Sequence, residues 1–397
     1  MKANFEIRKL TESDRETRIK MMRYAFQTSK NTYDNLELDK SPMDWYYGAF
    51  EGETMVATAG IIPFDIRLRS KDFKMHGVEG VATKPQYRNL GIIRDIMIEM
   101  FKNMLENNIP LSVLYPFKFS FYEMLGYRLV DEHAYYQFRI SDIIYEETTY
   151  HMKEVVRIDD EIRKVYDKVI QKFDYIAIRP IVDYWRGLYK GNYKFICYNQ
   201  NEPVGYVIIS FGKPDDRWHK SPEKTIIIRE TFWLNQEAKR TIFNFLWSHR
   251  DQRKYVSGTF PKNENIIDLL KTPRIINRNI LGNSMLRVIN VKTILENIEY
   301  PIPNFTLTLQ IHDRFCPWNN RFFILTSKEK NITVDYLNNS EDTIDIEIDI
   351  GYFSQLVAGF RTVKDLLEFG FIRVNDKKLD LLQDLFPKTN NFMHNFF

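Results

Sequence analysis

Two arginines and a glycine stand three residues apart where a helical pattern begins. Arg88, Gly91 and Arg94 belong to the stretch QYRNLGIIRD (86–95), which follows Pro85. A helix dipole disfavours positive side chains at the helix start, so an anion from outside the chain is the expected partner. The unpaired N–H groups there bind phosphate oxygens, a glycine opens the backbone to them, and arginines add charged donors. The spacing therefore predicts a diphosphate site. Solvated arginines beside a turn glycine are an equally weighted alternative, because one Arg-x-x-Gly spacing is a weak signal.

The elements around this motif are a helix and the strands on either side of it. Apolar residues recur at intervals of three and four after Gly91, which is typical of a helix packed on a core. They are Ile92, Ile93, Ile96, Met97, Met100, Phe101, Met104 and Leu105. Segments 54–69 and 75–83 before the helix, and 109–117 after it, are strand-like. Pro85 fixes the turn after the second strand and leaves three backbone positions free to pair with an extended ligand. These positions are Val81, Ala82 and Thr83.

Length and composition limit the class of protein. A chain of 397 residues predicts two or three domains, and 44% hydrophobic with 27% charged residues indicates a globular protein. The net charge of +3 gives no indication of a nucleic-acid surface. Cys197 and Cys316 have no paired spacing and the seven histidines are scattered, so we expect no metal. No signal peptide and no run of roughly 20 apolar residues is present, which predicts a cytoplasmic protein without a membrane segment.

The pattern of elements changes twice along the chain. The first third alternates strands and helices, and the middle, from about 145 to 285, mixes them again without a second Arg-x-x-Gly helix start. From about 286 onward, segments such as NFTLTLQIHD and TIDIEIDI alternate in the manner of half-buried strands. We therefore expect three closely packed domains.

The segment from Val81 to Arg94, VATKPQYRNLGIIR, resembles the acetyl-CoA signature of the GNAT superfamily of N-acetyltransferases. Ile93 fills a position where most superfamily members carry glycine or alanine. In this respect the chain resembles one branch, the Eis (enhanced intracellular survival) acetyltransferases. The resemblance extends to FYEMLGY (121–127), to MLRVINV (285–291) and to the aromatic chain end.

The resemblance implies an α+β fold. Tandem GNAT-fold domains, each a mixed central sheet with flanking helices, would be followed by a sterol-carrier-protein-like α/β domain. The expected domains are a catalytic GNAT domain (1–144), a second GNAT-like domain without cofactor (145–285) and a sterol-carrier-like domain (286–397) that supplies the C-terminus. The resemblance also implies a homo-oligomer, in relatives a hexamer.

The resemblance further implies acetyl-CoA as co-substrate. Its pantetheine arm would pair with the strand before the motif, and its diphosphate would lie at the helix start. Phe117 and Lys118 would border the pantetheine or adenine moiety, although an ordinary surface lysine is the alternative for Lys118. The residues expected to bind acetyl-CoA are Val81, Ala82, Thr83, Arg88, Asn89, Leu90, Gly91, Ile92, Ile93, Arg94, Phe117 and Lys118.

Acetyl transfer to an amine needs a base and gains from an acid. An amine with pKa near 10.4 is almost entirely protonated at pH 7, so a base or a water relay must take its proton. An acid eases departure of the CoA thiolate. Tyr122, in SFYEMLGY, matches the family's general acid; a core tyrosine is the alternative.

The base implied by the family is the chain's own terminal carboxylate, here that of Phe397. Chain ends are usually polar and mobile, so an end of two phenylalanines suggests burial. An aromatic plug that leaves the carboxylate in solvent is one alternative, and Glu79, on the strand before the motif, is the rival base. A terminal carboxyl, with pKa about 3.5, is a weak base, so a water or a raised pKa would be needed.

The acceptor is the least defined part of the prediction. By resemblance it is a small-molecule or protein amine. Phe396 stands where aminoglycoside-modifying relatives can carry an acidic residue, which weakens the expectation for aminoglycosides. A catalytically idle GNAT-fold scaffold that binds CoA, or lipid through its third domain, is the alternative from another functional class.

Overall fold

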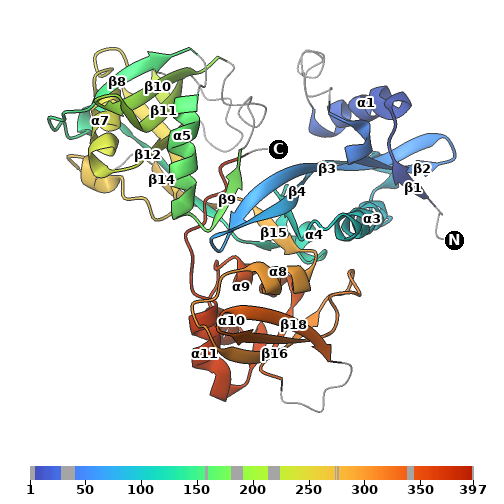
Figure 1. Cartoon of the computed structure of the whole chain (residues 1–397). Helices are drawn as coiled ribbons and strands as arrows, with labels where there is room; N and C mark the ends of the chain where they lie inside the picture. Colours follow the sequence, from blue (N-terminus) through green and yellow to red (C-terminus); the bar gives the residue numbers. More distant parts are fainter. Residues whose placement is uncertain are drawn as a thin grey trace.

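The computed structural model describes residues 5–27, 41–156, 160–179, 191–212, 224–272, 274, 277–337 and 344–395. Three β-sheets with flanking helices form three lobes that meet near the centre of the molecule (Figure 1). The α+β class predicted from the sequence is confirmed. Within the described residues, no helix is both long and apolar enough to cross a bilayer.

The first lobe is built on a sheet in which most neighbouring strands are antiparallel. Its order is β1-β2-β3-β4-β5-β15-β6, with β9 added along β3. The strands are β1 (Glu6–Lys9), β2 (Tyr46–Glu51), β3 (Thr54–Leu68), β4 (Lys71–Thr83), β5 (Leu111–Leu114), β6 (Arg128–Leu129), β9 (Tyr175–Ile178) and β15 (Met285–Val288). Only β4 and β5 pair in parallel within this sheet of the described chain, because a helix connects them.

Two helices cover opposite faces of the first sheet. The connecting helix α3 (Ile92–Glu106) buries its apolar stripe against β2 and β3, as the periodicity predicts. Helix α1 (Arg15–Phe26) packs Met21 and Met22 on the other face, against Met55 and Ala82. The short helix α4 (Phe119–Glu123) follows β5. Both long helices lie along the β3–β4 ribbon in Figure 1.

The second lobe repeats the plan of the first. Its sheet has the order β14-β7-β13-β12-β11-β10-β8, and β12 and β13 pair in parallel around helix α7 (Gln236–Trp247). Helix α5 (Asp160–Val169) covers the opposite face. The strands are β7 (Glu132–Arg139), β8 (His151–Val155), β10 (Tyr193–Asn199), β11 (Glu202–Phe211), β12 (Thr225–Trp233), β13 (Tyr255–Pro261) and β14 (Asn277–Gly282).

The first two sheets share strands across the expected domain limits. Strand β7 lies within residues 1–144 but pairs with β13 and β14 of the second sheet. Strand β15, at the 285/286 limit, returns to the first sheet between β5 and β6. The expected domain limits at 144/145 and 285/286 stay a prediction. The exchanged strands β7 and β15 connect the first two lobes through backbone pairing.

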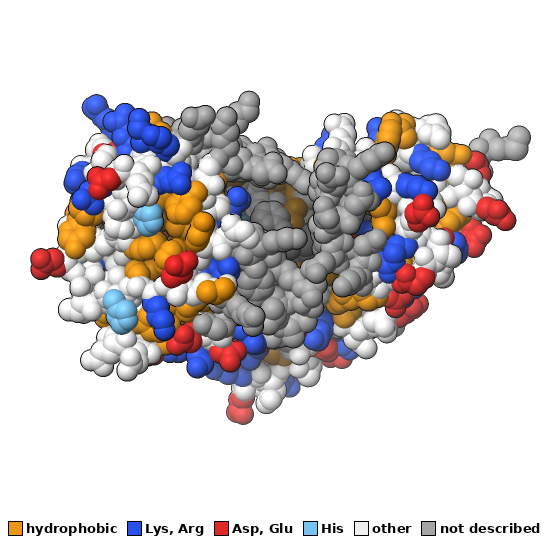
Figure 2. All heavy atoms as spheres, turned by 90° about the horizontal axis from the view of Figure 1, so that it is seen from above, with side chains coloured by type: hydrophobic (Ala, Val, Ile, Leu, Met, Phe, Trp, Pro, Cys, Tyr) orange, Lys and Arg blue, Asp and Glu red, His pale blue; other side chains and the backbone are white. Residues whose placement is uncertain are grey.

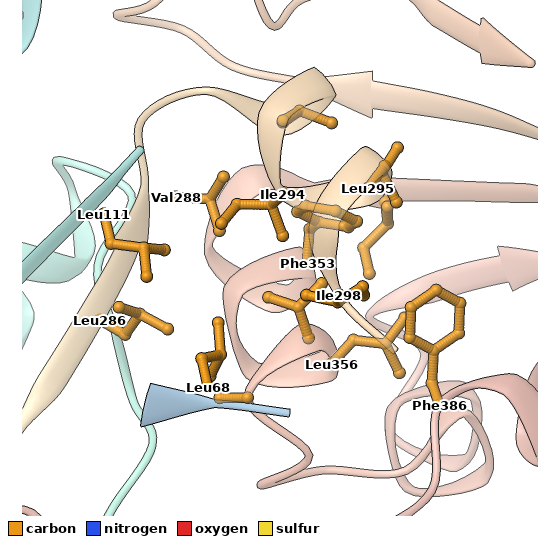
Figure 3. Packing of buried hydrophobic residues seen from close by; sticks show 14 of the residues in the cluster. Leu68, Leu111, Leu286, Val288, Ile294, Leu295, Ile298, Phe353, Leu356 and Phe386 are labelled. Atoms are coloured by element: carbon orange, nitrogen blue, oxygen red, sulfur yellow. The ribbon is translucent and has the colours of Figure 1, made fainter. Parts of the chain in front are cut away.

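The third lobe has a five-stranded sheet, β18-β17-β16-β19-β20, covered by helices. Its elements are α8 (Val291–Asn297), β16 (Phe305–His312), β17 (Phe322–Lys328), β18 (Asn331–Leu337), β19 (Ile346–Asp349), α9 (Ile350–Val357), α10 (Val363–Glu368), β20 (Ile372–Val374) and α11 (Leu379–Leu385). Figure 3 shows how its helices pack on the first sheet, in one continuous core. The first sheet contributes Leu68, Leu111, Leu286 and Val288, and the helices contribute Ile294, Leu295, Phe353 and Leu356.

Candidate active site

Strands β4 and β5 separate at a point that we call the first fork. Their pairing ends at Val78 with Leu114, while β4 continues to Thr83 bonded only to β3. The β3–β4 register shifts at the same place, and Gly80 there has φ +61°. In the described part of the chain, the fork therefore leaves one backbone edge of β4 without a strand partner. Val81, Ala82 and Thr83 lie on this segment.

The start of α3 lies beside the first fork and has no side-chain cap. Gly91 precedes the helix in a left-handed conformation, with φ 79°, and Asn89 is also left-handed, with φ 64°. A methyl group added at Gly91 would lie 2.8 Å from Nη2 of Arg94, so only the flexible end of that arginine fills the space. Arg94 Nε donates to Asp95 at 2.8 Å, whereas Arg88 is exposed and forms no ion pair within the described chain.

The remaining residues of the motif contribute unequally to this helix start. The side chains of Ile92 and Ile93 are buried in the first-lobe core, so only their backbone N–H groups face the helix mouth. Leu90 is 54% exposed and Phe117, after β5, is 70% exposed. Lys118 is exposed and precedes α4 without capping it. The start of α3 thus keeps backbone donors without a side-chain cap, and Leu90 just before it is exposed.

Tyr122 is buried inside an aromatic cluster on α4. Its side chain is 3% exposed, and its ring meets Phe117 at 5.5 Å, Phe121 at 5.1 Å and Tyr127 at 6.1 Å between centroids. Burial raises the pKa of the Tyr122 hydroxyl above its ordinary value. No hydrogen-bond partner of this hydroxyl lies within the described part of the chain. A buried, protonated hydroxyl thus lies on the short helix that follows β5.

Gly126 closes α4 against a buried arginine. Its φ is +82°, and an added methyl group would lie 1.9 Å from Nη1 of Arg287, a β15 residue that is paired with Asp313. We expect Gly126→Ala to destabilise the fold by about 2 kcal/mol or more and to lower turnover, because α4 and Tyr122 must shift. Thermal unfolding and kcat measure this. Gly370→Ala is the control, because Gly370 has φ +70° and open space around it; equal losses in both variants would contradict a role for the Arg287 contact.

Glu79 stands where the first fork opens and already has partners. Its Oε1 accepts a hydrogen bond from the Tyr46 hydroxyl at 2.6 Å and lies 3.5 Å from Nη2 of Arg18. The Arg18 guanidinium also stacks over the Tyr46 ring, 3.5 Å from its centroid. No sequence pattern predicts this trio, because its members come from α1, β2 and β4.

The C-terminal tail (387–395) runs from the third lobe to the place where the first two lobes meet. Phe392 N–H donates to the Tyr175 carbonyl at 2.9 Å, and the carbonyl of Asn395 accepts from the Tyr115 hydroxyl, one residue beyond β5. Figure 2 looks down on the hollow between these two lobes. Phe396 and Phe397, with the predicted catalytic carboxylate, lie outside the described residues.

Three family models match the chain in the order expected. An acetyltransferase (GNAT) domain matches residues 6–130, a second acetyltransferase (GNAT) domain matches 179–288, and a sterol carrier protein domain matches 291–394. An uncharacterized N-acetyltransferase of Streptomyces avermitilis is 22% identical over 326 residues, which are 76% of each chain. The chain is therefore an N-acetyltransferase of the GNAT type.

Solved structures share the whole arrangement. A GCN5-related N-acetyltransferase from Anabaena variabilis superposes with a TM-score of 0.87 at 19% identity, covering 99% of this chain and 100% of that one. Eis1 from Mycobacterium abscessus gives a TM-score of 0.78 at 16% identity, with coverage of 99% and 100%. The fold of two GNAT domains and a sterol carrier domain is confirmed, and so is the predicted resemblance to Eis-type proteins.

Proposed function

We propose that this chain moves an acetyl group from acetyl-CoA to a primary amine, with Tyr122 as general acid and the Phe397 carboxylate as general base. The observation that carries the proposal is the first fork beside an uncapped helix start, with a buried tyrosine hydroxyl next to it. The GNAT fold itself implies the use of acetyl-CoA.

The residues of the first fork are suited to an extended ligand that ends in phosphates. The open edge of β4 at Val81 and Thr83 offers backbone donors and acceptors to an amide-containing arm, and the N–H groups after Gly91 offer donors to a diphosphate. Arg88 adds an exposed cation. Acetyl-CoA supplies the activated acetyl group when it binds there.

Two proton transfers fall to the chain's own groups. Tyr122 would donate its proton to the departing sulfur, for which a raised pKa keeps the hydroxyl protonated. The terminal carboxylate would accept a proton from the amine, directly or through a water. The tail supports this role, because its last described residue, Asn395, already contacts Tyr115 at the end of β5.

The packing of the third lobe disfavours the scaffold alternative. Its helices α8 and α9 bury their apolar residues against Leu68 and Leu286 of the first sheet, in one core (Figure 3). These apolar faces are used to hold the catalytic lobe. A lipid-binding role would have to displace that contact.

The proposal is tested by release of free thiol from acetyl-CoA with a panel of amines. We expect turnover with at least one amine, and Arg88→Gln should raise KM for acetyl-CoA about ten-fold at unchanged kcat, since a charged phosphate donor is lost. Lys102→Gln, an exposed cation farther along α3, is the control and should change neither constant. Cofactor binding without turnover on any amine would favour the scaffold.

The acceptor and the assembly are finer parts of the proposal. A small-molecule or protein amine is proposed as acceptor, and the amine panel should include lysine peptides beside aminoglycosides. A hexamer is proposed by resemblance to Eis-type relatives, and light scattering of the purified chain measures its mass.

A further inference from the structure

The second lobe contains a fork like the first one. Strands β12 and β13 pair in parallel as far as Ile228 with Gly258, and β12 then continues to Trp233 with β11 as its one strand partner among the described residues. The β11–β12 register shifts at the same place, as in the first fork. The helix that follows differs, because the Asn235 side chain accepts from Ala238 N–H at 2.9 Å and caps α7. The second fork therefore lacks an open helix start for an anion.

The C-terminal tail lies at the second fork. The Nε2–H of His394 donates to the carbonyl of Arg229 at 2.8 Å, on the part of β12 beyond β13. Phe392 packs on Phe232 of the same strand, with ring centroids 6.0 Å apart. The described part of the tail thus contacts, through Phe392 and His394, the β12 segment that corresponds to the open edge of β4.

A buried arginine holds this end of the tail. Arg179, directly after β9, has a side chain that is 1% exposed and forms a two-bonded ion pair with Glu230, at 3.0 and 2.8 Å. Its Nε donates to Oδ1 of Asn395 at 2.8 Å, and its Nη2 donates to the carbonyl of His394 at 2.5 Å. Tyr206 donates to Glu230 at 2.7 Å. Glu230 thus has the partners in the second fork, a tyrosine and an arginine, that Glu79 has in the first.

We propose that Arg179, oriented by Glu230, is a positioning residue for the chain end. It fixes the backbone at His394 and Asn395, and two further residues reach at most about 7 Å. Fixing Asn395 beside Tyr115 therefore limits how far the terminal carboxylate can move from that point. The second fork thus acts as a clamp that holds the tail in place. The clamp itself does not depend on the proposed function; only the catalytic use of the clamped end does.

Carboxypeptidase A, which removes aromatic C-terminal residues, tests the clamp without any acetyltransferase assay. The intact protein should release phenylalanine slowly. Arg179→Lys keeps a positive charge beside Glu230 but loses the planar fork that reaches both His394 and Asn395. We expect it to release phenylalanine about ten-fold faster, because charge-assisted hydrogen bonds to the tail are lost.

A matched variant separates release of the tail from general loosening of the lobe. Lys239→Gln breaks a buried ion pair with Glu264 in the same lobe, 2.6 Å long, away from the tail contacts. If its melting temperature equals that of Arg179→Lys, Lys239→Gln should still release phenylalanine at the wild-type rate. Release from Arg179→Lys at the wild-type rate, or acceleration in both variants alike, would overturn the clamp.

Steady-state kinetics of the same variant connect the clamp to catalysis. Arg179→Lys should lower kcat about ten-fold and leave KM for acetyl-CoA within about two-fold, because the first fork is intact. Faster phenylalanine release with unchanged kcat would support the clamp and overturn the terminal carboxylate as the base. A lower kcat with a protected chain end would overturn the positioning role.

Discussion

Tyr122→Phe should lower kcat by about 10²- to 10⁴-fold, the usual contribution of a general acid. The variant removes one oxygen from a ring that is 3% exposed and has no hydrogen-bond partner in the described chain, so the fold should lose little stability. KM for acetyl-CoA should stay at the wild-type value, because the substitution leaves the first fork and the start of α3 unchanged. Thiol release at saturating amine measures the loss.

The pH dependence of kcat also tests Tyr122 as the general acid. An acid must be protonated to act, and burial raises the pKa of Tyr122 above its ordinary value of 10. Its protonated fraction therefore stays close to one through neutral pH, and any loss of kcat from ionisation of this hydroxyl falls above about pH 10. A fall of kcat between about pH 7 and 9 that disappears in Tyr122→Phe would contradict the assignment.

Tyr127→Phe is the matched control for Tyr122→Phe. Tyr127 belongs to the same cluster and is fully buried, but its hydroxyl bonds Ser112 at 2.7 Å. Removing it should cost about 1 kcal/mol of stability and leave kcat near the wild-type value. Equal losses of activity in the two variants would instead favour a core role for both tyrosines.

Local patterns in the sequence predicted the elements around the site well. The apolar stripe after Gly91 predicted a helix from 92 to 105, and α3 spans Ile92–Glu106. Gly126 follows α4 with φ +82°, the conformation in which a glycine commonly ends a helix. These features depend on residues a few positions apart, which is why periodicity and a glycine suffice to predict them.

The long-range features were beyond such patterns. Nothing in the sequence of β7 or β15 says that each pairs in the sheet of the other lobe, because strand order depends on packing across the whole fold. The helix after the second fork does not begin with an Arg-x-x-Gly motif. The two forks resemble each other in backbone geometry, which the sequence motif does not reveal. Arg179 and Asn395 are 216 positions apart in sequence. Arg179 and Asn395 meet because the C-terminal tail returns from the third lobe to the first two, and no local sequence pattern indicates this return.

One alanine added after Phe397 should lower kcat about 10²-fold or more. The addition moves the terminal carboxylate by roughly 3.5 Å along the chain, beyond the tolerance of a proton transfer that needs hydrogen-bond contact. Asn395 keeps its contacts with Arg179 and Tyr115, so the tail itself should stay in place. Thiol release measures the effect, and an alanine inserted after Met1 controls for the added residue.

Glu79→Gln decides between the two candidate bases. The amide keeps an oxygen to accept from Tyr46, which now bonds Glu79 at 2.6 Å, but it cannot take a proton from an amine. If the chain end is the base, Glu79→Gln should retain most of kcat while the extended chain loses it, because the Glu79 carboxylate is already engaged by Tyr46 and lies beside Arg18. The reverse result would make Glu79 the base and overturn the terminal carboxylate in that role.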